Sequence, residues 1–256
     1  MRSARSSNRK HSGTVRIGTA GWSLASRYKP DFPDSGSHLE RYAAVFDAAE
    51  INTSFYRPHK PSTYEKWTAA TPEGFRFAVK APKAITHAKD VDTSQDLARF
   101  MQEIAGLGSK LGPILIQLPP NRKFLEADAT RLLSGFRHAH AGGLVLEPRH
   151  PTWFEDDAEE LLVSLRIARV AADPPRAVGA DAPGGWQKLV YFRLHGSPEI
   201  YRTSYGAERL RPIAASLHSA SRTGADVWCM FDNTASSAAT ADALRLKLMR
   251  AQPQPS

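Results

Sequence analysis

Short apolar stretches recur along the chain and predict eight β-strands. Each stretch is rich in β-branched or aromatic residues and ends in glycine, proline, asparagine or aspartate, as strands commonly do. Apolar and polar positions alternate within most of them, which is typical of a pleated strand with two different faces. The eight stretches cover residues 15–22, 48–56, 75–82, 114–119, 143–149, 167–174, 189–196 and 226–233.

Segments with a helical spacing of apolar residues lie between these stretches. Several begin with serine, aspartate or threonine at the position of a helix cap. Because strands that alternate with helices form a parallel sheet, eight strands in one chain of this size predict a single (β/α)8 barrel of the TIM type. The predicted helices cover residues 38–46, 62–70, 94–112, 126–136, 156–166, 207–222 and 236–250.

The link between the sixth and seventh strands interrupts this pattern, because residues 175–189 (PRAVGADAPGGWQKL) are rich in proline and glycine. We expect a loop or a short helical turn there, so that one helix of the barrel is irregular or missing. The competing architecture is an open, doubly wound sheet, which usually carries a glycine-rich phosphate turn after its first strand. Here that turn reads GTAGWS and lacks both nucleotide-binding glycine motifs, which favours the barrel.

Alternation also predicts which side chains fill the barrel, since one face of each strand meets the helices and the other faces inward. In the seventh strand the residues at 190, 192 and 194 are apolar, so Tyr191, Arg193 and His195 face the interior. In the sixth strand the same reasoning turns Asp173 inward. Of Asp232 and Asn233, which end the eighth strand, the pattern does not say which points inward. The other polar residues predicted on the inner face are Asn52, Tyr56, Lys80, Gln117, Glu147 and Arg149.

These polar residues gather near the C-terminal ends of the strands, where the active sites of TIM barrels lie. Burying an unpaired charge costs several kcal/mol, so the set must pair internally, meet water or bind a ligand. The alternative is an interior salt-bridge network that only stabilises the barrel. Its expected members lie early in their strands, at Glu50, Arg76 and Arg169.

Composition and net charge restrict the possible functions less than the polar residues at the strand ends do. The chain has 256 residues and a net charge of +8, and half of that charge comes from Arg2, Arg5, Arg9 and Lys10. We therefore expect a disordered basic leader over residues 1–14, one barrel domain over residues 15–249 and a frayed tail over residues 250–256. A single cysteine, Cys229, excludes an intrachain disulfide. With no apolar signal or membrane segment, this indicates a cytoplasmic protein without a membrane partner.

The ordered motifs of the chain resemble those of the YecE-like proteins, also catalogued as domain of unknown function seventy-two. The resemblance covers residues 15–249 and implies a TIM-type barrel without an established activity. Similar barrels include endonuclease-IV-like and sugar-isomerase-like enzymes, so the resemblance also suggests a metal-dependent nuclease or a sugar isomerase. The motifs are GTAGW (18–22), EINTSFY (50–56), FRFAVKAP (75–82), LIQLPP (115–120), LEPRHPTW (146–153), RLHG (193–196) and FDNT (231–234).

The residues of the rim are more typical of an anion site than of a metal centre. Lys80, Arg149 and Arg193 could bind a phosphate or carboxylate, and arginine does so with two parallel hydrogen bonds. His195 or His150 could then exchange a proton near neutral pH, oriented by Glu147 or Asp173. A divalent metal held by Glu147, His150, Asp173, His195 and Asp232 remains an alternative, although three cations on the same rim oppose it.

Aromatic residues on or after the strand ends could stack on a base or a sugar ring. They are Trp22, Tyr56, Trp153, Tyr201 and Tyr205; the alternative is a hydrophobic lid over the barrel.

Two functional hypotheses follow from this pattern. The first is an enzyme, possible reactions being those of a hydrolase or a lyase, that binds a phosphate-bearing substrate. Its predicted catalytic residues are Glu147, Arg149, Arg193 and His195. The second is a nucleic-acid-binding module without catalysis, which would use the basic leader.

Overall fold

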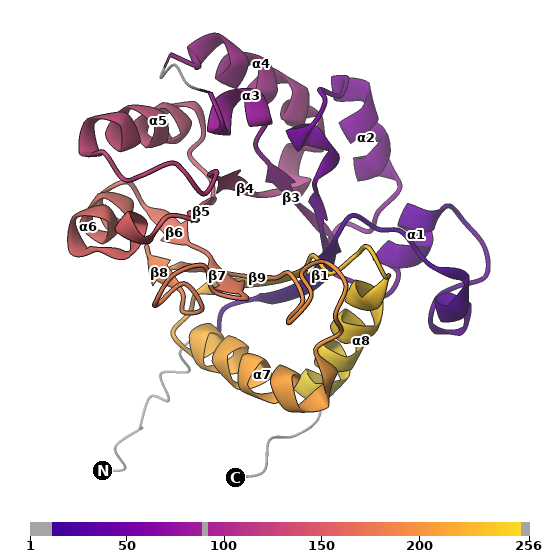
Figure 1. The fold of residues 1–256 in the computed structure, drawn as a ribbon. Helices are drawn as coiled ribbons and strands as arrows, with labels where there is room; N and C mark the ends of the chain where they lie inside the picture. The colour runs from indigo at the N-terminus through magenta and orange to yellow at the C-terminus, as the bar shows by residue number, and fades with distance from the viewer. Residues whose placement is uncertain (1–11, 89–91, 252–256) are drawn as a thin grey trace, which may run out of the picture.

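The structure, a computed structural model, describes residues 12–88 and 92–251. A mostly parallel sheet of ten strands curls into a nearly closed ring, and helices surround it (Figure 1). This confirms the predicted α/β barrel class. The strands are β1 (Val15–Ala20), β2 (Ala48–Ile51), β3 (Arg76–Lys80), β4 (Leu111–Gln117), β5 (Leu144–Glu147), β6 (Ile167–Arg169), β7 (Ala171–Asp173), β8 (Gly184–Gly185), β9 (Leu189–Leu194) and β10 (Asp226–Phe231).

The strands follow one another around the ring in the order β7-β9-β10-β1-β2-β3-β4-β5-β6-β8. The predicted sixth strand is divided at Val170, which separates β6 from β7. Since β6 pairs with β5 and β7 pairs with β9, this one segment joins the two ends of the sheet. Residues 174–188, all of which the structure describes, form turns and the short strand β8, which pairs antiparallel with β6.

The helices lie on the outside of the ring, between consecutive strands (Figure 1). The α-helices are α1 (His38–Ala43), α2 (Pro61–Ala69), α3 (Lys83–Thr86), α4 (Ser94–Ile104), α5 (Glu126–Ala139), α6 (Asp156–Ser164), α7 (Gly206–Arg222) and α8 (Ala238–Ala251). The 3-10 helices are η1 (Ser26–Asp31), η2 (Thr53–Phe55), η3 (Ala105–Lys110) and η4 (Pro151–Phe154). Most of the predicted leader 1–14 and tail 250–256 lies outside the described residues.

Two predicted boundaries are wrong for local reasons. The helix expected over residues 94–112 ends at Ile104 and continues as η3, where Gly108, with φ +50, departs from helical geometry. The second strand ends at Ile51 rather than at residue 56, and the following residues turn into η2. Alternation therefore cannot be extended from Glu50 to Tyr56.

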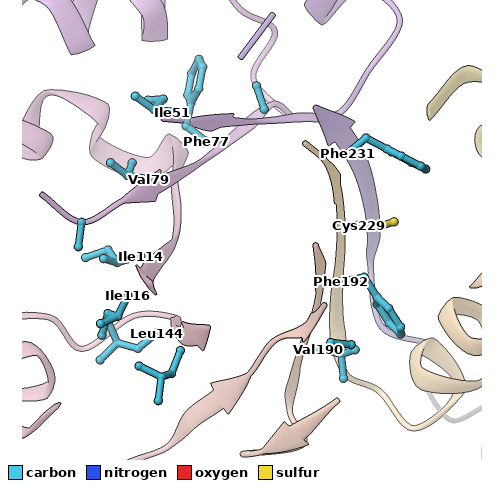
Figure 2. Close-up of a cluster of buried hydrophobic side chains, with 14 of the residues drawn as sticks. Ile51, Phe77, Val79, Ile114, Ile116, Leu144, Val190, Phe192, Cys229 and Phe231 are labelled. Atoms are coloured by element: carbon cyan, nitrogen blue, oxygen red, sulfur yellow. The ribbon is translucent and has the colours of Figure 1, made fainter. Parts of the chain in front are cut away.

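Two apolar layers hold the ring together. Figure 2 shows outward-facing side chains of the strands, among them Ile51, Phe77 and Phe192, pointing away from the ring, and these belong to the larger buried cluster with the helices. The smaller cluster fills the interior with the side chains of Ala48, Ala78, Leu115, Val145, Ala168, Val170, Ala172, Leu189, Tyr191, Trp228 and Met230.

The sixth strand has its faces opposite to the prediction. Ala168, Val170 and Ala172 belong to the interior cluster, whereas Ala171 packs in the outer one. Small alanines occur on both faces, so hydrophobicity did not distinguish them. As a consequence Asp173 is directed away from the interior.

Candidate functional site

A buried ion cluster lies at the C-terminal ends of the strands, with Arg193 of β9 at its centre. The Arg193 side chain is only 1% exposed. Its Nε and Nη2 atoms donate to the Glu50 carboxylate over 2.8–3.1 Å. Its Nη1 atom donates to Glu147 at 3.0 Å and to Gln117 at 3.2 Å, and Nη2 lies 2.9 Å from the Asp232 carboxylate. All three nitrogens of the guanidinium are therefore engaged inside the protein.

His195 lies between two carboxylates of this cluster. Its Nδ1 atom is 3.0 Å from Asp232 Oδ2, and its Nε2 atom is 3.1 Å from Glu147 Oε1. A neutral imidazole carries one N–H and could donate to only one of them, so the geometry favours the imidazolium. Burial lowers the pKa of His195, but the two carboxylates outweigh burial and raise it above its ordinary value.

The same pairing fixes the charge of the two acids. Burial raises the pKa of Glu147, but Arg193 and His195 outweigh this and hold it well below the ordinary value. For Asp232 burial again opposes ionisation, and the two cations again lower its pKa. Both carboxylates are therefore ionised at neutral pH.

Two further cations of the rim are less fully engaged than Arg193. The Arg149 side chain is 14% exposed, and its only ion pair within residues 12–88 and 92–251 is a long contact of 3.4 Å to Glu147. Its buried Nε atom has no hydrogen-bond partner there. Lys80, at the end of β3, has its ammonium 4.0 Å from the centre of the Phe55 ring. Among the described residues, these two side chains are thus less fully paired with carboxylates than Arg193 is.

A narrow pocket lies beside the cluster, between the ends of β5 and β9. Glu147, Arg149, His195 and Tyr201 line it, together with Arg176 from the link that lacks a helix. Tyr201 is 40% exposed and meets the His195 ring edge-on at 5.8 Å. The backbone of Tyr201 has φ +70, a conformation that is strained for a bulky residue. Such strain is often found beside functional sites.

Asn52 and Gln117 also reach the cluster, as their predicted inward positions require. The Asn52 amide donates to Asp232 at 3.4 Å and accepts a long bond from Arg193 at 3.5 Å. Gln117 and Asn52 therefore help to orient Arg193, and Asn52 also contacts Asp232.

Asp173 and Tyr205 form a separate group outside the ring. The Tyr205 hydroxyl donates to the Asp173 carboxylate at 2.8 Å, and Arg209 of α7 pairs with the same carboxylate at 3.0 Å. Tyr205 is 3% exposed and cannot serve as a stacking surface. Asn233 also points outward, and its amide donates to Thr203 and to Asp242 of α8. Asp232 is thus the inward member of the pair that ends the eighth strand.

The remaining aromatic candidates do not meet the ion cluster. Trp22 packs edge-on against Trp67 of α2 at 5.1 Å, in the helix layer. Trp153 is fully buried and donates its indole N–H to the Arg122 carbonyl at 2.9 Å. Tyr56 is 79% exposed, because the turn η2 carries it outward. His150 caps η4 by accepting from the Thr152 amide.

Sequence reasoning placed Glu50 in a stabilising network but missed its partners. Glu50 accepts from Arg193 and from the Tyr191 hydroxyl, the latter at 2.7 Å. The alternating positions of Tyr191 and Arg193 were the available signal. The other two expected members lie elsewhere: Arg76 bonds to backbone carbonyls, and Arg169 pairs with Glu159 of α6.

The carboxylate oxygens of the cluster, which are its potential metal ligands, face cationic side chains rather than one common point where a metal ion could lie. In the part of the chain that the structure describes, no three His, Cys, Asp or Glu side chains are grouped as a metal site requires. The oxygens of Glu147 and Asp232 face Arg193 and His195 instead.

The fold and the charged ends of its strands define a TIM-type barrel protein. Within that class, the chain belongs to the family described as "Protein of unknown function DUF72", which it matches over residues 16–255. The resemblance to YecE-like proteins is thereby confirmed.

Two curated relatives share part of their sequence with this chain. The UPF0759 protein YecE of Escherichia coli K12 is 32% identical over 125 residues, which cover 48% of this chain and 45% of that protein. The UPF0759 protein YunF of Bacillus subtilis 168 is 29% identical over 113 residues, which cover 41% and 40%. The matched part of the chain thus spans less than half the length of these relatives.

Solved structures share the whole fold. A DUF72 family protein from Enterococcus faecalis V583 has a TM-score of 0.77 at 19% identity and covers 94% of this chain and 97% of its own. One from Thermotoga maritima MSB8 has a TM-score of 0.75 at 25% identity, covering 93% and 99%. The 3-keto-D-glucoside 4-epimerase YcjR of Escherichia coli has a TM-score of 0.55 at 14% identity, covering 93% and 100%. Among the described residues, no helix is both long and apolar enough to cross a bilayer.

Proposed function

We propose that the chain is an enzyme that binds a small phosphate-bearing substrate at the C-terminal ends of its strands. The observation that carries this proposal is the contrast between two arginines. Arg193 is saturated by internal partners, whereas Arg149 lines the pocket with an Nε atom that has no partner among the described residues. A guanidinium in this state has donors available for a bidentate bond to an oxyanion.

In this proposal the anion is held by Arg149, with Lys80 as the second cation of the rim. His195 is the proton donor, because it is charged and lines the pocket together with Glu147. Glu147 keeps the imidazolium oriented, and Arg193 keeps Glu147 ionised. A sugar-derived phosphate would suit a barrel of this class, although the likeness to the Escherichia coli epimerase extends to the fold alone.

The anion site is tested by phosphate binding to the Arg149→Met variant. Charged hydrogen bonds contribute about 1.5–3 kcal/mol, so we expect phosphate affinity to fall by about tenfold or more. The measurement is a calorimetric titration of the full chain with inorganic phosphate. Arg131→Met serves as the matched control, because Arg131 is exposed on α5 and carries the same charge. Equal affinity in the wild type and in Arg149→Met would contradict the proposal.

The nucleic-acid interpretation stays a prediction, and its basic leader lies largely outside the described residues. If it holds, binding of single-stranded DNA should fall steeply with salt concentration. A titration of the chain lacking residues 1–12 separates the two sources of charge. Loss of all binding in that variant would assign it to the leader and not to the barrel.

A further inference from the structure

Lys80 differs from the other charged groups of the ion cluster, because no carboxylate is committed to it. Its side chain is 6% exposed, and the ammonium makes no hydrogen bond or ion pair with the residues that the structure describes. Its nearest recorded partner is the Phe55 ring, whose centre lies 4.0 Å from Nζ. The ring holds the amine in position without accepting a conventional hydrogen bond from it.

The acids of the cluster are already neutralised by other cations. Glu50 pairs with Arg193, Glu147 pairs with both Arg193 and Arg149, and Asp232 pairs with His195 as well as Arg193. Three carboxylates therefore meet three cations when His195 is charged. A fourth positive charge on Lys80 would give this buried cluster a net charge, so the ammonium of Lys80 is less stable than that of an exposed lysine.

The titration of Lys80 follows from the groups that surround it. Burial lowers the pKa most, and Arg193 lowers it further, while the three acids oppose them, with a net pKa of about 8. His87, beyond α3, is a further basic group close to Lys80. The groups that face Lys80 are Arg193 of β9, Glu50 of β2, Glu147 of β5, Asp232 after β10 and His87 after α3.

We propose that Lys80 is a nucleophilic amine that forms an imine with an aldehyde or ketone substrate. The Nζ atom attacks the carbonyl carbon, a C–N bond forms, and the carbonyl oxygen leaves as water with the two protons of the amine. The step consumes no oxidant or reductant. Amines of this kind are activated by burial and by neighbouring cations, both of which Lys80 has.

This inference deepens the proposed function, on which it rests for the location of the substrate. Arg149 would hold the phosphate of a substrate whose carbonyl group reaches Lys80. The substrate class is then a small carbonyl compound that carries a phosphate, rather than a phosphate ester in general.

The test is reductive trapping on the full chain. The protein is incubated with dihydroxyacetone phosphate, reduced with sodium borohydride, digested and examined by mass spectrometry. A pKa of about 8 leaves far more neutral amine at pH 7 than an ordinary lysine has. We therefore expect Lys80 to be labelled at least about tenfold more than the exposed Lys83 of α3, with labelling rising through about pH 8.

Two variants and a second probe make the result decisive. Lys80→Arg should remove the label from that position, whereas Lys83→Arg should leave the labelling of Lys80 unchanged. Equal labelling of Lys80 and Lys83 in the folded wild type would overturn the imine. If dihydroxyacetone without phosphate labels Lys80 equally well, the imine stands and the phosphate site at Arg149 fails. If phosphate binds as proposed and neither ketone labels Lys80, the imine alone is overturned.

Discussion

Replacing Arg193 by methionine is expected to destabilise the chain by about 3–5 kcal/mol, the usual effect of removing one partner from a buried ion pair. The guanidinium is fully buried and touches Glu50, Glu147 and Asp232. Without it, three acids share one buried site with only His195 and the more weakly engaged Arg149 to balance them. The measurement is the free energy of unfolding from urea denaturation at pH 7.

The pH dependence of this variant separates lost charge pairing from lost packing. Protonation neutralises the acids that Arg193 no longer pairs, so the defect of Arg193→Met should shrink as the pH is lowered towards about 5. Arg99→Met is the control, because Arg99 pairs with Asp96 at the surface, where such pairs contribute about 0–1 kcal/mol. A loss in Arg193→Met no larger than in this control would mean that the ion cluster does not stabilise the barrel.

Strand periodicity was sufficient to predict much of the ion cluster. In β3, β4, β5 and β9 bulky apolar residues mark the outer face, so the inward position of Lys80, Gln117, Glu147 and Arg193 follows from counting by twos. The β4–β5 and β9–β10 pairs keep their register up to the strand ends, so the alternation persists there. The barrel class follows from the same regularity.

Alternation does not predict the direction of a side chain where the backbone leaves the strand conformation, or where both faces of a strand carry similar residues. Tyr56 follows the turn η2, so its direction depends on a local hydrogen bond between its amide and Thr53 rather than on alternation. In β6 and β7 alanines occupy both faces, and the reversed assignment carried Asp173 to the wrong side. Tyr201, in a loop, and Trp153, in η4, follow no strand periodicity that would predict how far each is exposed.

The ion-pair partners of the charged side chains could not be predicted from the sequence either. Sequence reasoning brought Arg193 and Lys80 to the same rim, but it had no information on which carboxylates each would meet. Glu50 is 143 positions from Arg193 in the chain, and the curvature of the ring brings them together. The distinction between a saturated arginine and an available lysine therefore belongs to tertiary structure.

Replacing His195 by glutamine is expected to remove a loss of stability that the wild type shows at alkaline pH. The folded pKa of His195 is raised, so the unfolded chain releases its proton first. The stability that His195 contributes is fully present below its unfolded pKa of about 6.5 and is lost as the pH rises through the folded pKa. Each unit of pKa difference corresponds to about 1.4 kcal/mol. The measurement is the free energy of unfolding at several pH values from 6 to 10.

The titration of Lys80 changes the free energy of unfolding in the opposite direction, so its contribution must be separated from that of His195. Its pKa is lowered to about 8, so it increases stability as the pH rises from there towards its unfolded value. Both proteins contain Lys80, and the difference between their two pH profiles therefore isolates His195. Glutamine keeps a side-chain donor but cannot carry the charge that Glu147 and Asp232 share. Two profiles that stay parallel from pH 6 to 10 would show that the pKa of His195 is not raised by its carboxylates, and a wild type that gains stability relative to the variant as the pH rises from 6 would show that the folded His195 is neutral. Either result would contradict its role as a proton donor.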